Sequence, residues 1–325
     1  MKQKILLVLM LIISVIALYF LFNQLNKISQ NGTEVKLPDK AQFKIAATFF
    51  PIYDIAKNIA GDKAEVIQIL PKGASPHTFE PNIQDQQKIS ECKLVFMNGF
   101  GIDNWVLDLL DENVTQTLPP NTSVNDAPGL LQGGQIYLVQ VSQNIDLLPA
   151  EEEEDSSGFD PHIWLNIANA KIIATNISDT LVQLDPANAV YYQNNLQNYQ
   201  QELQNTLERS LEKITGLENK QLITFHDAFA YFAKELGLEI AATIEPFPGK
   251  EPTAAYLAEV ANIINQYGIK VLFKEPQLSD TVVTTLANDY GATVYTLDPE
   301  GALPDITTFI ELYEYNVDSI VSALK

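Results

Sequence analysis

Residues 186–217 read PANAVYYQNNLQNYQQELQNTLERSLEKITGL and lie between two halves of the chain that each alternate strand-like and helix-like segments. Large apolar side chains recur there every three or four residues, at Tyr192, Leu196, Tyr199, Leu203, Leu207, Leu211 and Ile214. This spacing is typical of an amphipathic helix, and proline is tolerated in its first turn. At about 1.5 Å per residue, such a helix spans on the order of 45 Å. We predict one long helix that joins two lobes, and favour it over a coiled coil because no other segment repeats the pattern.

The flanking halves predict an α/β fold in which each lobe contains a parallel sheet. Strand-like segments lie at residues 44–49, 66–70 and 94–97 in the first half, and at 221–225, 270–273 and 294–297 in the second. Helical segments separate them, and strands alternating with helices favour parallel pairing. We therefore expect an N-terminal lobe over 43–185, the connecting helix over 186–217 and a C-terminal lobe over 218–325. Paired prolines and glycines between 113 and 155 indicate turns only.

The N-terminus predicts a membrane anchor over residues 1–30, followed by a polar linker over 31–42. Lys2 and Lys4 precede an apolar run from Ile5 to Phe22 in which Ser14 is the polar residue. The run is close to the length that crosses a bilayer, and no small-residue cleavage site follows it. The two lysines favour an extracytoplasmic location for the rest of the chain. A cleaved signal peptide, which would leave a periplasmic protein, is the alternative.

Composition excludes several classes of protein. The chain has 20 basic and 41 acidic residues, a net charge of −21, and Arg209 as its only arginine. Nucleic acid is therefore not an expected partner, because phosphate recognition needs a clustered basic surface. Cys92 is the only cysteine, which excludes an intrachain disulfide, a cysteine-rich zinc site and a lipid attached to a cysteine after the apolar run.

The three histidines occupy related positions in the predicted fold. His77 follows the second strand of the first lobe, His162 precedes the long connection, and His226 ends a strand of the second lobe. Asp298 follows the last strand. Ligands collect beyond the carboxyl ends of parallel strands, so these loops could meet across a cleft. Three imidazoles and a carboxylate suit tetrahedral zinc, although loop histidines satisfied by the backbone remain the alternative at this point.

Residues near the histidines in the sequence are further candidates for the site. The stretch 160–165, DPHIWL, holds His162 between a proline and large apolar residues, which restricts its direction. Glu80 and Asp227 are candidates to orient the ligands, or ordinary helix caps. Residues 275–277 would line the cleft or form a turn. The acidic run 151–155 is interpreted as a solvated loop, with a weak role in gathering cations as the alternative.

Five segments together resemble the zinc and manganese solute-binding proteins of ABC transporters (cluster A-I). They are, in order, residues 70–81 (LPKGASPHTFEP), 160–165 (DPHIWL), 225–232 (FHDAFAYF), 273–277 (FKEPQ) and 297–299 (LDP). The resemblance covers nearly everything after residue 43. It implies two α/β lobes joined by a long helix, with the metal between them, and its ligand positions match His77, His162, His226 and Asp298. The run 151–155 replaces the histidine-rich loop of many zinc members.

The resemblance implies a receptor that captures Zn²⁺ and delivers it to an ABC permease, and not an enzyme. Members that resemble manganese binders have glutamate at the third ligand position, where this chain has His226. An imidazole in place of a carboxylate favours zinc over the harder manganese ion. We expect a monomer attached to the membrane by its N-terminal segment. A manganese receptor is the main alternative, followed by a zinc hydrolase and an anchored adhesin.

Overall fold

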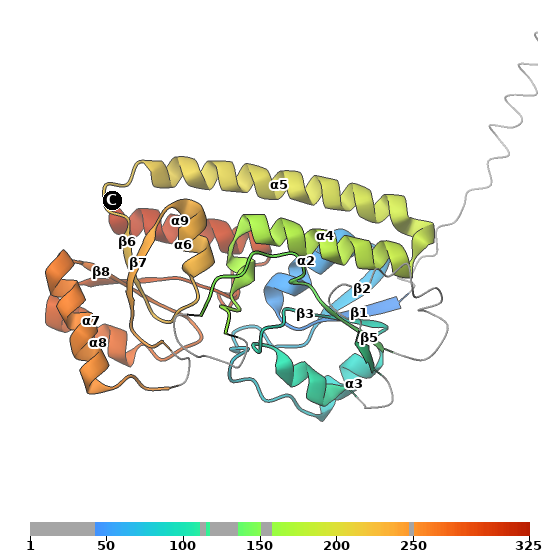
Figure 1. Ribbon diagram of the computed structural model, residues 1–325, viewed down its shortest axis with the longest axis horizontal. Coiled ribbons are helices and arrows are strands. Elements are labelled where there is room, and N and C mark those ends of the chain that lie inside the picture. Colours follow the sequence, from blue (N-terminus) through green and yellow to red (C-terminus); the bar gives the residue numbers. More distant parts are fainter. Residues whose placement is uncertain (1–42, 111–114, 118–135, 151–157, 247–249) are drawn as a thin grey trace, which may run out of the picture. The chain divides into compact units, whose positions relative to one another are not determined.

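The computed structural model describes residues 43–110, 115–117, 136–150, 158–246 and 250–325 (Figure 1). The predicted anchor 1–30, the linker 31–42 and the acidic run 151–155 lie outside the described residues. Residues Ala41–Lys325 belong to one compact unit. Among the helices that the structure describes, none combines the length and apolar character needed to cross a bilayer.

The N-terminal lobe contains a five-stranded parallel sheet in the order β2-β1-β3-β5-β4. Its strands are β1 (Phe43–Ala47), β2 (Ala64–Gln68), β3 (Leu94–Met97), β4 (Thr115–Thr117) and β5 (Ile136–Gln140). Its helices are α2 (Phe50–Ala60), α3 (Ile83–Ser90) and α4 (Ile167–Leu184), with a 3-10 helix at Asn104–Leu109. The sequence predicts the first three strands, but it misses β4 and β5, which lie beside the turn signals between 113 and 155.

The C-terminal lobe is built from two parallel strand pairs, β6-β7 and β8-β9. The strands are β6 (Gln221–Thr224), β7 (Glu239–Thr243), β8 (Val271–Lys274) and β9 (Thr293–Thr296), and the helices are α6 (Ala230–Leu236), α7 (Ala254–Tyr267), α8 (Thr281–Tyr290) and α9 (Phe309–Leu324). Three of these four strands match the prediction, whereas β7 is an addition. The parallel-sheet α/β class is confirmed for both lobes.

Helix α5 (Ala189–Thr215) confirms the predicted long connection, with a 3-10 turn at Pro186–Asn188 before it. It passes along both lobes, packing on α4 at one end and on α9 at the other (Figure 1). Its buried apolar side chains are Tyr192, Tyr199, Leu203 and Ile214, whereas Leu211 is 38% exposed. Near its C-terminal end, Arg209 and Lys213 form ion pairs with Glu314 and Asp318 of α9. The helix therefore connects the lobes and is attached to both.

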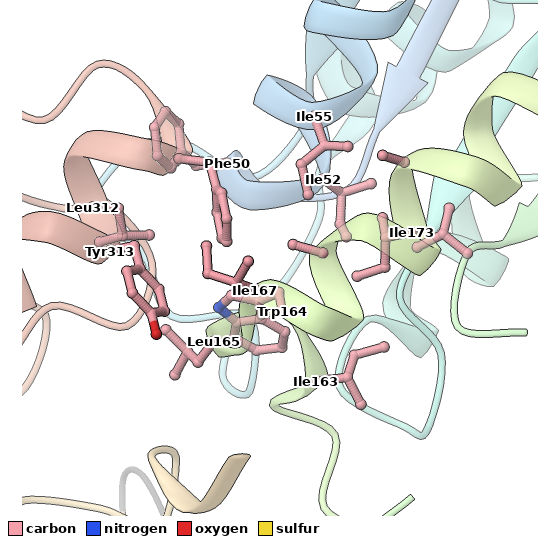
Figure 2. Close-up of a cluster of buried hydrophobic side chains, with 14 of the residues drawn as sticks. Phe50, Ile52, Ile55, Ile163, Trp164, Leu165, Ile167, Ile173, Leu312 and Tyr313 are labelled. Carbon is pink, nitrogen blue, oxygen red and sulfur yellow. The ribbon is translucent and has the colours of Figure 1, made fainter. Parts of the chain in front are cut away.

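The hydrophobic core is continuous from one lobe to the other. Trp164, which is fully buried, packs with Phe50 and Ile167 of the N-terminal lobe close to Leu312 and Tyr313 of α9 (Figure 2). Burying apolar surface contributes about 25 cal/mol per Å², so this shared core opposes separation of the lobes. Large hinge motion is thus disfavoured by the packing.

Two carboxylates, the buried Asp54 and the partly buried Glu235, hold helix ends across the same boundary. Asp54 of α2 accepts a hydrogen bond from the backbone N–H of Phe309, at the start of α9 (2.8 Å). Glu235 of α6 accepts the N–H groups of Ile167 and Ala168, at the start of α4 (2.8 and 2.9 Å). A carboxylate satisfies the unpaired donors at a helix N-terminus and interacts favourably with the helix dipole. Each lobe therefore caps a helix of the other.

We expect Asp54→Ala to lower the free energy of unfolding by about 1–3 kcal/mol, because it leaves the buried N–H of Phe309 without an acceptor. Asp54→Asn keeps an oxygen at that position and should cost less. Urea unfolding followed by circular dichroism measures the difference. Equal stability of the two variants would contradict the capping role.

The pH dependence of stability in Asp54→Asn and in the wild type tests whether the pKa of Asp54 is raised. Burial raises the pKa of Asp54 from its usual 3.8 to about 6, so folding favours the protonated carboxyl. The resulting stabilisation is present below about pH 4 and is lost as the pH rises through about 6. The stability of Asp54→Asn relative to the wild type should therefore increase over this interval. A difference independent of pH would mean that the Asp54 pKa is not raised.

Candidate metal centre

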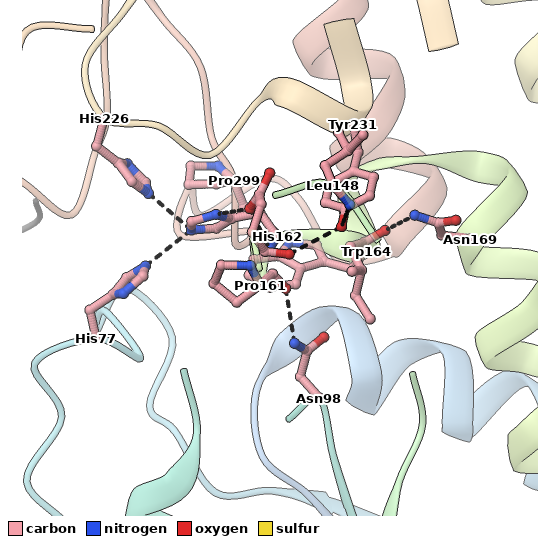
Figure 3. Close-up of polar contacts among 12 residues, drawn as sticks. His77, Asn98, Leu148, Pro161, His162, Trp164, Asn169, His226, Tyr231 and Pro299 are labelled. Carbon is pink, nitrogen blue, oxygen red and sulfur yellow. Dashed lines mark hydrogen bonds and ion pairs between the residues drawn. The ribbon is translucent and has the colours of Figure 1, made fainter. Parts of the chain in front are cut away.

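Three segments that are distant in the sequence bring the histidine rings together (Figure 3). His77 lies in the loop after β2, His162 directly precedes the 3-10 turn Ile163–Leu165, and His226 follows β6. The Nε2 atom of His162 is 3.1 Å from that of His77 and 3.2 Å from that of His226. In the described part of the chain, these three residues form the group that could hold a metal ion, with ligand atoms within 4.8 Å of one another.

These separations fit a small tetrahedral cation. Zinc–nitrogen bonds of about 2.0–2.1 Å at tetrahedral angles place two nitrogen ligands roughly 3.3 Å apart. The observed 3.1 and 3.2 Å are close to that value. His162 and His226 are 0% and 1% exposed, so the centre lies inside the protein rather than on its surface.

Carboxylates orient two of the three rings. His162 Nδ1 lies 2.8 Å from Asp160 Oδ1, and His226 Nδ1 lies 2.7 Å from Glu275 Oε1. A carboxylate that accepts the Nδ1 proton leaves the Nε2 lone pair facing the centre. Two such lone pairs 3.2 Å apart repel each other unless a cation lies between them. This arrangement favours metal binding over the interpretation of the histidines as satisfied loop residues.

The surroundings favour the neutral form of His77 and His162. Burial, followed by the proximity of the other histidines, holds the pKa of His77 and of His162 well below the usual 6.5. Neutral imidazole is the form that ligates metals, so protons compete less at this centre than at exposed histidines. Burial also raises the pKa of Asp160 to about 7, and a cation bound to His162 would favour its ionised form.

Backbone contacts fix the loop that carries His162. Asn98 Nδ2 donates to the carbonyl oxygen of Pro161 (2.9 Å), and Trp164 Nε1 donates to that of Pro299 (2.7 Å). Tyr231 Oη donates to the carbonyl oxygen of Asp160 (3.2 Å). These bonds tie the loop to β3 on one side and to the C-terminal lobe on the other. His162 therefore occupies a rigid position at the boundary between the lobes.

Asp298 is fully buried near this boundary, and its carboxylate is occupied by its own loop. Its Oδ1 atom accepts the N–H groups of Glu300 and Ala302 (both 3.0 Å), and its Oδ2 atom accepts that of Leu303 (2.9 Å). The three-histidine group does not include Asp298. A carboxylate that follows a strand can face a ligand or cap the loop behind it, and the sequence does not distinguish the two. Its role as a fourth ligand stays a prediction.

Glu300 is a residue that the sequence reasoning misses. It is 6% exposed, and neither carboxylate oxygen has a hydrogen-bond partner among the described residues. Burial, together with the nearby carboxylates of Glu275 and Asp298, raises its pKa well above the usual range. A buried carboxylate without a partner is costly unless a proton or a cation compensates it. The one available signal was its place two residues after Asp298.

The ligand-orienting residues also differ from those expected. Glu80 is exposed, and Asp227 lines a separate pocket beside α6 and α7, whereas the bonds described above to the histidine Nδ1 atoms come from two other carboxylates. Asp160 and Glu275 make these bonds instead. Both residues stand in the motifs 160–165 and 273–277. Glu80 and Asp227 also stand in such motifs, 70–81 and 225–232, so a place in a motif did not distinguish the two pairs of residues.

Replacing Glu275 should weaken metal binding without removing a ligand. We expect Glu275→Ala to lower the affinity about 10- to 100-fold, because His226 loses the acceptor that directs its ring. Glu275→Gln keeps an acceptor oxygen and should have a smaller effect, while the exposed Glu218→Gln serves as a matched control. Competition with a chromogenic chelator measures the affinity. An unchanged value for Glu275→Ala would show that the bond is not used.

Known proteins resemble this chain over most of its length. The family model described as "Zinc-uptake complex component A periplasmic" matches residues 45–323. The manganese-binding lipoprotein MntA of Halalkalibacterium halodurans is 31% identical over 297 residues, which are 88% of this chain and 90% of the relative. The high-affinity zinc uptake system protein ZnuA of Bacillus subtilis is 30% identical over 295 residues, 86% and 87% of the two chains.

The fold is shared with solved structures as well. A mutant of the laminin-binding adhesin Lmb of Streptococcus agalactiae superimposes with a TM-score of 0.74 at 26% identity. The match covers 87% of this chain and 100% of that structure. Two α/β lobes joined by a long helix are therefore common to this chain and these relatives.

Proposed function

Because the chain belongs to the family described as the periplasmic component A of zinc-uptake complexes, we propose that it captures Zn²⁺ outside the cytoplasm and delivers it to an ABC permease. The family is one of metal-binding transport receptors, not enzymes, so the hydrolase alternative is set aside. The observation that carries the choice of zinc is the set of three converging imidazole nitrogens. Names do not decide the metal, because relatives of similar identity are named for manganese and for zinc.

The donor set supports zinc on chemical grounds. Imidazole is a ligand of intermediate softness that suits Zn²⁺, whereas Mn²⁺ prefers oxygen ligands and higher coordination numbers. The third ligand position is His226, held by Glu275, where members resembling manganese binders have glutamate. Nitrogen–nitrogen separations of 3.1 and 3.2 Å suit short zinc–nitrogen bonds. A manganese receptor remains the alternative that the experiment below separates.

A carboxylate from the loop after β9 is the proposed fourth ligand. The sequence assigns this role to Asp298, whose Oδ1 atom accepts two backbone N–H groups and whose Oδ2 atom accepts one, so that Oδ2 keeps a lone pair for a cation. Glu300 on the same loop is buried, and its oxygens have no partner among the described residues. A second acidic side chain is therefore available to balance the charge of the cation.

Location follows from the N-terminal sequence. Several relatives are named lipoproteins. This chain has Cys92 as its only cysteine, and that side chain is buried beside β3, so no cysteine near the N-terminus can carry a lipid. We propose that the apolar segment from Ile5 to Phe22 replaces the lipid as the anchor of a monomeric receptor on the outer face of the cytoplasmic membrane.

The choice of metal is tested by competition between Zn²⁺ and Mn²⁺ for the purified protein. We expect the wild type to prefer zinc by several orders of magnitude, His162→Ala to lose high-affinity binding, and His226→Glu to shift the preference toward manganese. Calorimetry with each metal, together with circular dichroism to confirm folding, gives the result. Manganese binding as tight as zinc binding in the wild type would contradict the proposal.

Asp298→Asn and Glu300→Gln distinguish the two candidate carboxylates. We expect Glu300→Gln to lower zinc affinity while stabilising the metal-free protein, because it removes a buried acid whose oxygens have no hydrogen-bond partner among the described residues. Asp298→Asn should mainly lower the melting temperature, because it weakens the bonds that hold its loop. If only Asp298→Asn reduced zinc affinity, at unchanged stability, the fourth ligand would be Asp298.

A further inference from the structure

A pocket of about 520 Å³ adjoins the histidine group, and His77 belongs to both. Its walls come from the loop around His77, from residues 101–108 and from Pro161, the residue before His162. Pockets of this volume accommodate small organic molecules, and this one is far larger than a metal ion requires. Its place beside His77 calls for a ligand that approaches the metal from this side.

The pocket is on the accessible side of the metal centre. His162 and His226 are 0% and 1% exposed, whereas His77 is only partly buried. A molecule in the pocket would therefore reach a bound cation past His77. Zinc that has three nitrogen ligands can take a fourth and even a fifth ligand, so an added donor atom is compatible with a protein carboxylate from the opposite lobe.

The pocket walls combine three chemical features. Phe79, Ile102 and Leu107 give it an apolar surface, and Leu107 is 47% exposed. Trp105 contributes an indole N–H that is buried and has no hydrogen-bond partner among the described residues. Asp108 adds an exposed carboxylate. One hydrogen-bond donor, one anionic group and an apolar wall beside a cation match a molecule that has a carboxylate, an ammonium group and an apolar side chain.

We propose that this pocket binds an α-amino acid with an apolar side chain as a co-ligand of the metal held by the three histidines. The carboxylate of the amino acid faces the metal and the Trp105 N–H, its ammonium group faces Asp108, and its side chain packs against Phe79 and Leu107. This inference rests on the proposed function, since the cation supplies the main attraction for the carboxylate.

The test uses the full-length protein loaded with Zn²⁺ and titrated with L-leucine by calorimetry. We expect one leucine to bind per zinc-loaded protein and at least about tenfold weaker binding to the metal-free protein. Isocaproate, which lacks the amine, and isopentylamine, which lacks the carboxylate, should each bind about tenfold more weakly than leucine. Metal analysis after gel filtration confirms that the zinc stays on the protein.

Two variants locate the binding. Trp105→Phe removes the N–H while keeping an aromatic ring, and Asp108→Asn removes the charge. Each should weaken leucine binding about 5- to 10-fold while leaving zinc affinity unchanged. Glu259→Gln, in the separate pocket beside α6 and α7, is the matched control and should have no effect. If Trp105→Phe did not fold, the effect of Asp108→Asn on leucine binding would by itself test the pocket assignment.

The outcomes separate this inference from the function on which it rests. No leucine binding to the zinc-loaded protein at millimolar concentration would overturn the pocket assignment, and so would equal binding to the metal-free protein or to Asp108→Asn. Failure of the protein to bind zinc in the absence of leucine would instead overturn the proposed function.

Discussion

The convergence of three imidazole rings at the boundary between the lobes is the constraint on which the rest of the structure depends. The Nε2 atom of His162 lies 3.1 Å from that of His77 and 3.2 Å from that of His226. Asp160 and Glu275 direct the Nε2 lone pairs of His162 and His226 toward the same point. Such an arrangement is unfavourable without a cation, because the lone pairs repel each other and burial shields His162 and His226 from bulk solvent. The surrounding protein must therefore hold the rings in place.

The boundary between the lobes provides that rigidity. Trp164 anchors the His162 loop to the C-terminal lobe through the carbonyl oxygen of Pro299, and its ring lies in the shared core. Asp54 and Glu235 cap helices of the opposite lobes, and α5 contacts both. A metal site assembled from two lobes keeps its geometry only if the lobes do not move independently. Cargo release is thus better served by local movement of loops, such as the one that carries His77, than by wide opening of the cleft.

The carboxyl groups around the three histidines differ in what they bond. Asp160 and Glu275 each bond an imidazole, and Asp298 bonds the backbone of its own loop. Glu300 lacks a partner among the described residues, and burial leaves it dependent on a proton or a cation. The C-terminal lobe therefore supplies the carboxyl groups of Glu275, Asp298 and Glu300, while His77 lines the pocket in the N-terminal lobe. The two sides of the metal are chemically distinct.

The sequence by itself determined the α/β class and the long helix predicted over residues 186–217, because these depend on local periodicity. It also singled out His77, His162 and His226 as a group, because they are rare residues in loops and at a strand end. It missed β4, a strand of three residues, and also β5 and β7, which at five residues are as long as the strands that it predicted. Nor could it identify the groups that Asp298 and Glu275 bond, or show that the Glu300 oxygens have no hydrogen-bond partner among the described residues. These depend on which side chains meet after the lobes pack, and the same carboxylate can cap a loop, orient a histidine or remain without a partner. Only the tertiary structure decided among those roles, because the packing of the chain brings Glu275 to His226, 49 residues earlier, and the fold of its own loop directs Asp298 to N–H groups two to five residues later.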